Sequence, residues 1–595
     1  MALKHYRGRL TESVTPGAMF ANPPTLEFAS CTDICPDCQQ KLTVEKTRSK
    51  YVATLDMGRF RAHEQIRGCK RCENSITYPS EDLLRLVPHG CTFGFDILVH
   101  VGISTFLGCR TEAEIRLTLE RKDIAISPSE ITYLAKKFIV YLALAHRESR
   151  QRIRNFVNKQ GGYILHLDAT CDGDSPHLMT GLDGISEIVL ENIKLPSEKA
   201  EKIIPFLRDI KQRYGQPLAL VHDMGTAILS AVAEVFPDTP DYICHFHFLR
   251  DIGKDLLAKP YDKLRGCLRK HGIQGILRKR ARQFKQVIDS QPALADVFQE
   301  GLKKKNCPDV EQMPVVTAYS LILWALEGKK QGQGYGFPFD QPHLAFYDRV
   351  SVIYEIVKKA NESTTGKHRI KPYVKLIRDL YATMTDTSLA KTALHIKEKI
   401  AVFNKLRQAM RIALPDGQAG LNDDGEATDI GIIESNLKKF HQWLLQKADK
   451  TDDYQSMIRQ IETYWEKLFA DPIIVDTTNG KISIQPQRTN NVLERFFRNI
   501  KRGYRKARGV NTLTRTLKTM LAETPLVKNL ENEDYLRIIL NGAQCLEERF
   551  AQIDANMVRQ ELLKSSADQD LVAPWVKRLI KKNDFIQNLS ATFAP

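Results

Sequence analysis

The stretch YILHLD, Tyr163–Asp168, decides the fold class of this 595-residue chain. A short apolar run of this kind, bounded by glycine on one side and by an acid on the other, predicts a buried β-strand. A second run with the same ending, PLALVH at 217–222, is followed directly by Asp223. Between the two, residues 177–182 and 187–195 predict two further strands that meet at an Asp-Gly turn signal.

Amphipathic helices are expected between and after these strands. Residues 197–214 repeat apolar side chains at helical spacing, and residues 227–235 predict a second helix. A last strand is expected at 242–246. The order of three strands, helix, strand, helix and strand is the one expected of a ribonuclease-H-like domain. We therefore predict a multidomain chain with an α/β ribonuclease-H-like core.

Asp168 and Asp223 end two predicted strands that are apolar enough to be central in the sheet. If these strands are neighbours, the two carboxylates meet at one edge, where like charges repel unless cations lie between them. Hard divalent ions such as Mg²⁺ take oxygen ligands, and a pair of them activates an attacking oxygen and stabilises a leaving one. Strands often end on Asp in turns, and Asp172, Asp174 and Asp183 lie close to the first strand. Position on the strand is what favours Asp168.

A third acid lies in TNNVLERFFRNIKRGYRKARG, residues 489–509. Helical spacing places Leu493 and Ile500 on an apolar face and Glu494 on a polar one. A solvated charged face is the usual alternative for such a charge run, but together with two strand-end acids the pattern favours Glu494 as the third metal ligand. Seven cations follow it, enough to contact several DNA phosphates: Arg495, Arg498, Lys501, Arg502, Arg505, Lys506 and Arg508.

The cysteines gather near the start of the chain. Two Cys-x-x-Cys pairs, Cys35 with Cys38 and Cys69 with Cys72, have the spacing of a structural zinc site. The residues between them have strand-like patches, as a zinc ribbon would. Ordinary buried thiols are the alternative, and Cys31 or His63 could replace one ligand.

The rest of the chain reads as mostly helical. Thr111 and Ser127 open two capping boxes, and short helices joined by tight turns allow a helix-turn-helix DNA reader, although any small helical bundle shares the pattern. The expected regions are a zinc-ribbon-like part at 1–80, a helical DNA-binding part at 81–158, the first part of the core at 159–256, an all-helical insertion at 257–480, the last part of the core at 481–522 and a helical C-terminal part at 523–595.

Composition narrows the class of partner. Lys and Arg outnumber Asp and Glu by 87 to 71, a net charge of +16 that suits a polyanion. No run of about 18 apolar residues predicts a membrane-spanning helix, and the charged start lacks the pattern of a secretory signal. We expect a cytoplasmic, nucleoid-associated protein with double-stranded DNA as its partner and no membrane contact.

Several of these stretches resemble the catalytic blocks of DDE transposases: HLDAT, VHDMG, CHFHFLRD and TNNVLERFFRNIKR. The resemblance is to the prokaryotic insertion-sequence and Mutator-like groups that carry a helical insertion before the glutamate, and it covers roughly 160–256 and 481–520. It implies that Asp168, Asp223 and Glu494 bind two catalytic Mg²⁺ or Mn²⁺ ions. It also implies that four residues have a structural role near the active site: Cys244, His247, Asn490 and Asn491.

The function that the resemblance implies is transposition. A transposase cuts DNA at the ends of its element and joins the freed 3′-hydroxyl to target DNA, working as a homodimer or larger assembly. Three alternatives remain: a nuclease on the same fold without strand transfer, an inactive transposase-derived DNA-binding protein, and a zinc-stabilised helical scaffold whose basic charge is incidental.

Overall fold

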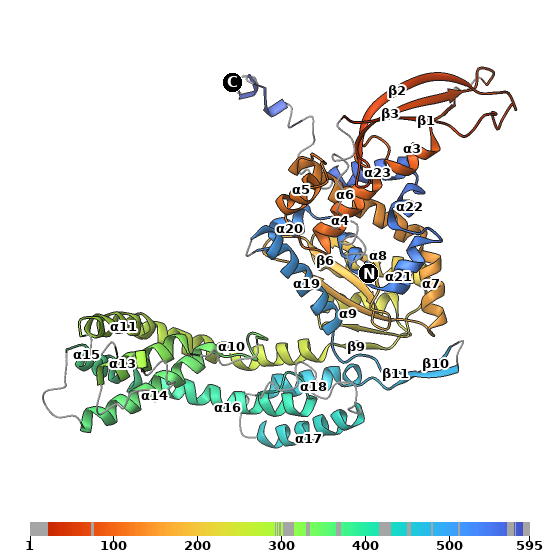
Figure 1. Ribbon diagram of the computed structural model, residues 1–595. Helices are drawn as coiled ribbons and strands as arrows, with labels where there is room; N and C mark the ends of the chain where they lie inside the picture. The colour runs from red at the N-terminus through yellow and green to blue at the C-terminus, as the bar shows by residue number, and fades with distance from the viewer. Residues whose placement is uncertain are drawn as a thin grey trace, which may run out of the picture. The chain divides into compact units, whose positions relative to one another are not determined.

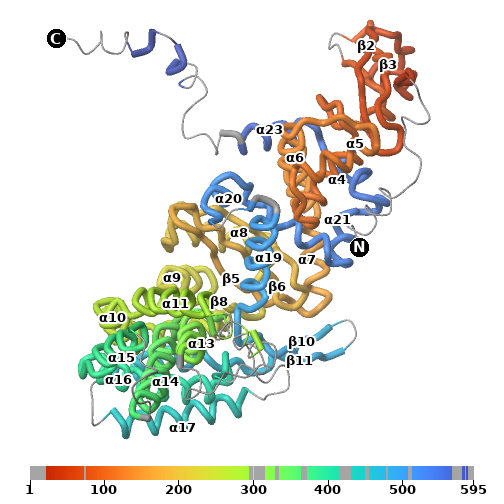
Figure 2. Tube along the Cα trace, turned by 60° about the vertical axis from the view of Figure 1, so that its left-hand side comes forward, coloured from red at the N-terminus to blue at the C-terminus, as the bar shows by residue number. Residues whose placement is uncertain are grey.

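The computed structural model divides the chain into two compact units, the first comprising Met1–Tyr242 with Pro472–Pro595 and the second Ile243–Asp471. Figure 1 and Figure 2 show the elements of both. Apart from a few isolated positions, the structure describes residues 22–72, 76–291, 314–328, 334–363, 371–415, 430–448, 454–477, 480–509 and 512–567.

The first unit begins with a small sheet in the order β1-β3-β2, with β4 beside β3. Its strands are β1 (Thr25–Ala29), β2 (Thr43–Thr54), β3 (Gly58–Gly68) and β4 (Thr77–Tyr78). β1 pairs in parallel with β3. It does so because Leu26 and Phe28 point to one face and pack against the buried Val52 and Phe60.

Helices follow this sheet: α3 (Glu81–Leu86), α4 (Phe95–Phe106), α5 (Glu112–Glu120), α6 (Pro128–Glu148) and α7 (Arg150–Lys159). Thr111 and Glu114 form the predicted capping box at the start of α5, and Ser127 caps α6, with Pro128 at its first position. From Lys137 to His146 every residue of α6 is buried. Because α6 is largely buried, α5 is the one of these two helices with a mostly exposed face.

A five-stranded sheet forms the middle of the unit, in the order β7-β6-β5-β8-β9. β5 is paired antiparallel to β6 and parallel to β8. Strands and helices occur in the order expected from the sequence: β5 (Ile164–Thr170), β6 (His177–Asp183), β7 (Val189–Leu195), α8 (Ala200–Tyr214), β8 (Ala219–His222), α9 (Thr226–Val235) and β9 (Asp241–Ile243).

One predicted strand differs. Residues 242–246 were expected to be extended, but β9 ends at Ile243 and α10 (His245–His271) begins two residues later. The apolar run that suggested a strand continues as Phe248, Leu249 and Ile252, all buried. That spacing belongs to one face of a helix.

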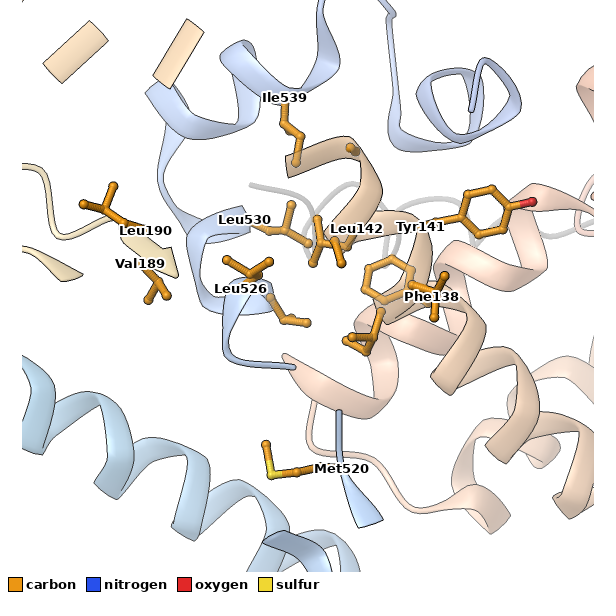
Figure 3. Packing of buried hydrophobic residues seen from close by; sticks show 14 of the residues in the cluster. Phe138, Tyr141, Leu142, Val189, Leu190, Met520, Leu526, Leu530 and Ile539 are labelled. Carbon is orange, nitrogen blue, oxygen red and sulfur yellow. The ribbon is translucent and has the colours of Figure 1, made fainter. Parts of the chain in front are cut away.

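C-terminal segments complete the core of the first unit. They are η3 (Thr524–Glu531), α21 (Glu533–Leu540), α22 (Leu546–Ala551) and α23 (Ala555–Ala567). Leu526 and Leu530 of η3 lie between α6 and β7 (Figure 3). The side-chain amide of Asn529 accepts from the N–H of Val189 and donates to its carbonyl, both at 2.8 Å. Asn529 thus satisfies backbone groups that the edge strand β7 would otherwise leave unpaired.

His146 joins three segments inside this core. Its Nδ1 lies 2.9 Å from the Tyr535 hydroxyl, and its Nε2 lies 2.9 Å from the Leu190 carbonyl and 3.1 Å from the Tyr214 hydroxyl. Burial lowers the pKa of His146 to about 4. The ring is therefore neutral at physiological pH.

Acid is expected to destabilise this core through His146. The unfolded chain takes up a proton as the pH falls through about 6.5, whereas the folded chain stays neutral down to about 4, so stability falls over that window and then levels off. Between pH 7 and pH 4.5 the loss should be roughly 2–3 kcal/mol. Urea unfolding followed by circular dichroism measures it. In His146→Gln, which cannot titrate, the pH dependence should shrink by that amount, and an unchanged dependence would refute the assignment.

The second unit is built from helices: α10 (His245–His271), α11 (Ile273–Asp289), α13 (Pro314–Glu327), α14 (Pro342–Ser363), α15 (Lys371–Met384), α16 (Thr387–Met410), α17 (Ile430–Ala448) and α18 (Gln455–Leu468). Its core includes Leu277, Ile322, Ile353 and Leu376. Throughout the described parts of both units, helices are too short or too polar to cross a bilayer.

The chain returns to the first unit through a hairpin of β10 (Ile473–Thr477) and β11 (Gly480–Ile484), then α19 (Asn491–Arg508) and α20 (Thr514–Thr519). β10 lies in the range predicted to be all-helical. Ile473 and Ile484 pack against Ile164, Ala219 and Val221 of the five-stranded sheet. That long-range packing explains why a strand forms there.

Candidate metal centres

Two acids lie at the same end of neighbouring central strands. In the parallel pair, Ile164 is opposite Ala219 and His166 is opposite Val221. The same offset places Asp168, on β5, opposite Asp223, which directly follows β8. Asp168 is buried, whereas Asp223 is partly exposed. The sheet thus brings the two carboxylates to one edge, as the sequence predicted.

The other acids near β5 have different partners. Asp183 lies opposite Leu165, toward the far end of β5, and its carboxylate accepts hydrogen bonds from Ile164, Ile185 and Ser186. It closes a five-residue loop in place of the expected two-residue turn, because the N–H of Asp183 itself bonds to the carbonyl of Ile188.

Asp172 and Asp174 are engaged with the segment around α20. Asp172 accepts from the N–H of Leu513 at 2.6 Å, and Asp174 pairs with Lys518 at 2.7 Å. These bonds give each rival acid a structural task. They hold Asp172 and Asp174 against the segment around α20, whereas Asp168 lies on β5 itself, where its carboxylate accepts from the N–H of Ala169 at 2.8 Å.

Asn490 fixes the start of α19 to β5. Its amide nitrogen donates to the carbonyl of Leu167 at 2.8 Å, and its oxygen lies 2.9 Å from Nδ1 of His166. All of these groups are buried. Because the amide nitrogen is the donor to Leu167, the oxygen accepts from His166, and this places the histidine proton on Nδ1.

Glu494 follows one helical turn later. Its N–H donates to the carbonyl of Asn490 at 2.9 Å, and Val492, Leu493, Phe496 and Phe497 bury the opposite side of α19. Since Asn490 touches β5 one residue before Asp168, Glu494 is held near the strand end that carries the two aspartates. Sequence reasoning placed Asn490 near the site but missed His166, because a histidine inside an apolar strand looks like an ordinary core residue.

The carboxylates of Asp168, Asp223 and Glu494 are not all within 4.8 Å of one another. In two-metal sites the ions lie about 3.5–4 Å apart and are held by acids on either side. The oxygen donors are those that Mg²⁺ and Mn²⁺ prefer. The three residues therefore fit the expected ions.

Replacing Asn490 by alanine is expected to destabilise the first unit by about 2–4 kcal/mol, because it leaves the buried Nδ1–H of His166 and the carbonyl of Leu167 without Asn490. It should also weaken Mn²⁺ binding, since Glu494 is no longer held against β5. Urea unfolding and Mn²⁺ titration calorimetry measure the two effects. Asn499→Ala, at an exposed position of the same helix, is the control; equal losses in both variants would contradict the positioning role.

The basic residues of α19 are mostly exposed. Arg498, Arg502, Arg505 and Lys506 are exposed and Lys501 is partly buried. Arg495 differs, because it pairs with Glu187 at 2.9 Å. Such an exposed pair contributes about 0–1 kcal/mol and yields easily to a phosphate. The side chain of Arg508 lies outside the described residues.

The predicted pair Cys244 and His247 lies at the start of α10. Cys244 is the N-terminal capping residue and is fully buried, and His247, partly buried, is in the first turn. Both belong to the second unit, whereas Glu494 belongs to the first.

The four predicted zinc cysteines come together at the end of the β2–β3 hairpin. Cys35, Cys38, Cys69 and Cys72 place their sulfur atoms within 4.8 Å of one another and could hold a zinc ion. The shortest distances are 3.4 Å between Cys38 and Cys69 and 3.7 Å between Cys35 and Cys72. Four thiolates in a compact group are the ligand set of a structural zinc site.

Backbone turns lower the pKa of the first thiol of each pair, whereas contacts with the neighbouring thiols raise the pKa of Cys38 and of Cys72. In the first turn the N–H of Gln39 bonds to the carbonyl of Cys35 at 2.9 Å. The N–H of Cys38 points at the sulfur of Cys35 and lowers its pKa to about 6. In the second, the N–H of Arg71 lowers the pKa of Cys69. Deprotonated thiols are the form that binds zinc.

The alternative ligands do not join this group. Cys31 is exposed, and its N–H bonds to Glu81. His63 lies on β3, where its Nδ1 is 2.8 Å from the Ser49 hydroxyl. The ligand set is therefore the two Cys-x-x-Cys pairs.

Comparison of the sequence with protein-family models and with curated proteins finds no match. The chemistry of the two centres is therefore argued from their own geometry.

Proposed function

We propose that this protein is a DNA transposase with a ribonuclease-H-like core, in which Asp168, Asp223 and Glu494 hold two Mg²⁺ or Mn²⁺ ions. The observation that carries the proposal is the register of β5 and β8 together with Asn490: two strand-end acids share an edge, and a helix bearing a third acid is fixed beside them. The order β7-β6-β5-β8-β9, with β5 antiparallel to β6 and parallel to β8, supports the assignment of the core.

The residues divide the work of phosphoryl transfer. When bound, the two ions supply activation of the attacking oxygen and stabilisation of the leaving oxygen. Asp168, Asp223 and Glu494 hold the ions and fix their spacing. The exposed Arg498, Arg502 and neighbouring cations of α19 bind backbone phosphates and keep the scissile strand in place. Positioning and charge stabilisation are what this reaction requires of a protein.

Other parts of the chain have supporting tasks in this proposal. The zinc-bearing sheet and the helices α5 and α6 bind the ends of the element. The helical second unit binds further DNA backbone through its basic residues. Two ends must be joined in one complex, so the active form is a dimer or larger assembly on double-stranded DNA.

The test is a cleavage and joining assay with Mg²⁺ or Mn²⁺. Its substrate is a duplex that carries the DNA flanking the gene and ends in a free 3′-hydroxyl. Wild type is expected to join this end to a target plasmid, whereas Glu494→Gln, which keeps the shape but removes a metal-binding charge, binds DNA and does not join it. Glu201→Gln, the same change on an exposed turn of α8, should join normally.

Other outcomes would replace the proposal. Cleavage without joining indicates a nuclease on the same core. DNA binding without cleavage by wild type indicates an inactive DNA-binding protein. Normal joining by Glu494→Gln means that the third acid is a different residue.

A further inference from the structure

The small N-terminal sheet has two unlike faces. Register pairs Val52 with Phe60 and Lys50 with Ala62 on the inner face, where Val52, Phe60 and Ala62 are buried together with Leu83 of α3. The outer face carries the alternate residues, of which Ala53, beside the bridge to Phe93, is buried, whereas those further along the strands are more exposed. Tyr51 and Arg61 are opposite each other there and both are exposed.

Positive charge dominates the outer face. Arg59 and Arg61 are exposed on β3, one step of about 6.8 Å apart along the strand. Neither forms an ion pair within the described residues. Glu27, the acid that β1 places on this face, lies 4.0 Å from His63. The guanidinium groups of Arg59 and Arg61 can therefore bind an anion from solution.

An aromatic ring orients one of these arginines. The guanidinium carbon of Arg59 lies 4.3 Å from the ring centroid of Tyr51, a cation–π contact at an exposed site. Tyr51 is 50% exposed, which is costly for a ring unless something covers it in use. The contact holds the Arg59 side chain flat on the sheet, so less freedom is lost when a ligand binds.

The dimensions of the ribbon suit duplex DNA. β2 has 12 residues and β3 has 11, and they pair along nearly their whole length (Figure 1). Because β1 lies beside β3 over residues 61–65, the outer face is a sheet surface that can lie along the phosphate backbone of a duplex. Arginines on this face contact phosphates, and the hydroxyls of Thr47 and Ser49 beside them are neutral donors of the kind that also bind the backbone.

We infer that the outer face of β2 and β3, through Arg59, Arg61 and Tyr51, is a binding surface for duplex DNA and contacts mainly its phosphates. The choice of DNA as the polyanion rests on the proposed function. The face is separate from α19, so the two contribute to affinity independently. Because phosphate contacts carry no sequence information, this surface positions the protein on DNA and does not read bases.

The test measures binding without chemistry. Full-length wild type and the double variant Arg59→Gln, Arg61→Gln are titrated, with no added Mg²⁺ or Mn²⁺, into a fluorescent duplex of arbitrary sequence at several salt concentrations. The variant is expected to bind roughly 10- to 100-fold more weakly at about 0.1 M salt, with a salt slope reduced by about 1.8, the value for two phosphate contacts. Arg208→Gln with Arg537→Gln, two exposed arginines in local ion pairs, removes the same charge and should change affinity far less.

Two further variants separate binding from folding. Arg59→Lys with Arg61→Lys keeps the charge and should keep the salt slope, whereas Tyr51→Leu should weaken binding without changing the slope. Zinc content and melting temperature report whether each variant is folded. The inference is wrong if the glutamine variant binds as tightly as its charge control. It is also wrong if the glutamine variant loses affinity for a single-stranded oligonucleotide but not for the duplex. Failure of wild type to join DNA despite full binding concerns the proposed function alone, so the two failures are distinguishable.

Discussion

Asp168→Asn should abolish metal-dependent strand cleavage and joining, by at least about 1000-fold, while the protein stays folded and bound to DNA. A factor of 1000 corresponds to about 4 kcal/mol of transition-state stabilisation, which is within what a misplaced metal ion forfeits. Asp168 lies on the central strand β5, two residues before its end, and the strand offset places it opposite Asp223. Product formation at saturating Mg²⁺ and at saturating Mn²⁺ measures the effect.

The neighbouring acids supply matched controls. Asp174→Asn removes one exposed ion pair with Lys518 and should leave the rate within about twofold, because such pairs contribute little. Asp172→Asn keeps an oxygen for the Leu513 N–H and should also remain active. If either control loses activity as fully as Asp168→Asn, the metal ligands must include an acid of the loop that follows β5.

Cys38→Ser is expected to release the zinc ion and unfold the outer half of the β2–β3 hairpin. The first seven residues of β2 are all exposed, so few apolar contacts hold that half together and the metal has to do so. Structural zinc binding of this kind provides about 10–16 kcal/mol in small domains. Loss of one of four ligands should weaken zinc affinity more than about 100-fold. The inner half, packed on Leu83 and Val87, should persist.

Zinc content by mass spectrometry and proteolysis within 43–50 measure the two effects. Cys31→Ser is the control, since Cys31 is exposed and outside the group. Chelation of wild type should reproduce the Cys38→Ser pattern. Full zinc retention by Cys38→Ser, or equal loss in Cys31→Ser, would contradict the four-cysteine assignment.

Local patterns predicted most of the five-stranded sheet. The apolar runs before Asp168 and Asp223 are bounded by turn residues, and each became a central strand. The same reasoning did not predict two other strands, because they depend on residues that are distant in sequence. β1 has only Leu26 and Phe28 as apolar residues and depends on β3, and β10 depends on packing against the sheet. In both cases the partner that the strand depends on lies elsewhere in the sequence.

For the candidate site, too, local sequence patterns predicted some features and long-range contacts determined the others. Residue type and position singled out Asp168, Asp223 and Glu494, and the Cys-x-x-Cys spacing singled out the zinc ligands. Strand position favoured Asp168 over Asp172 and Asp183, but the sequence could not show the hydrogen bonds of those two acids, because their partners lie hundreds of residues away or across a loop. His166 was missed for this reason, since its partner Asn490 is distant in sequence.

The second unit is inserted in the sequence between the two parts of the first unit, and this insertion has a consequence during synthesis. Glu494 leaves the ribosome about 270 residues after Asp223, and at about 5–20 residues per second that delay is roughly 15–50 s. Over this time β7 lacks Asn529, His146 lacks Tyr535 and the aspartates lack their third acid. A nascent chain therefore exposes an unfinished core and cannot bring the three acids together until translation is nearly complete.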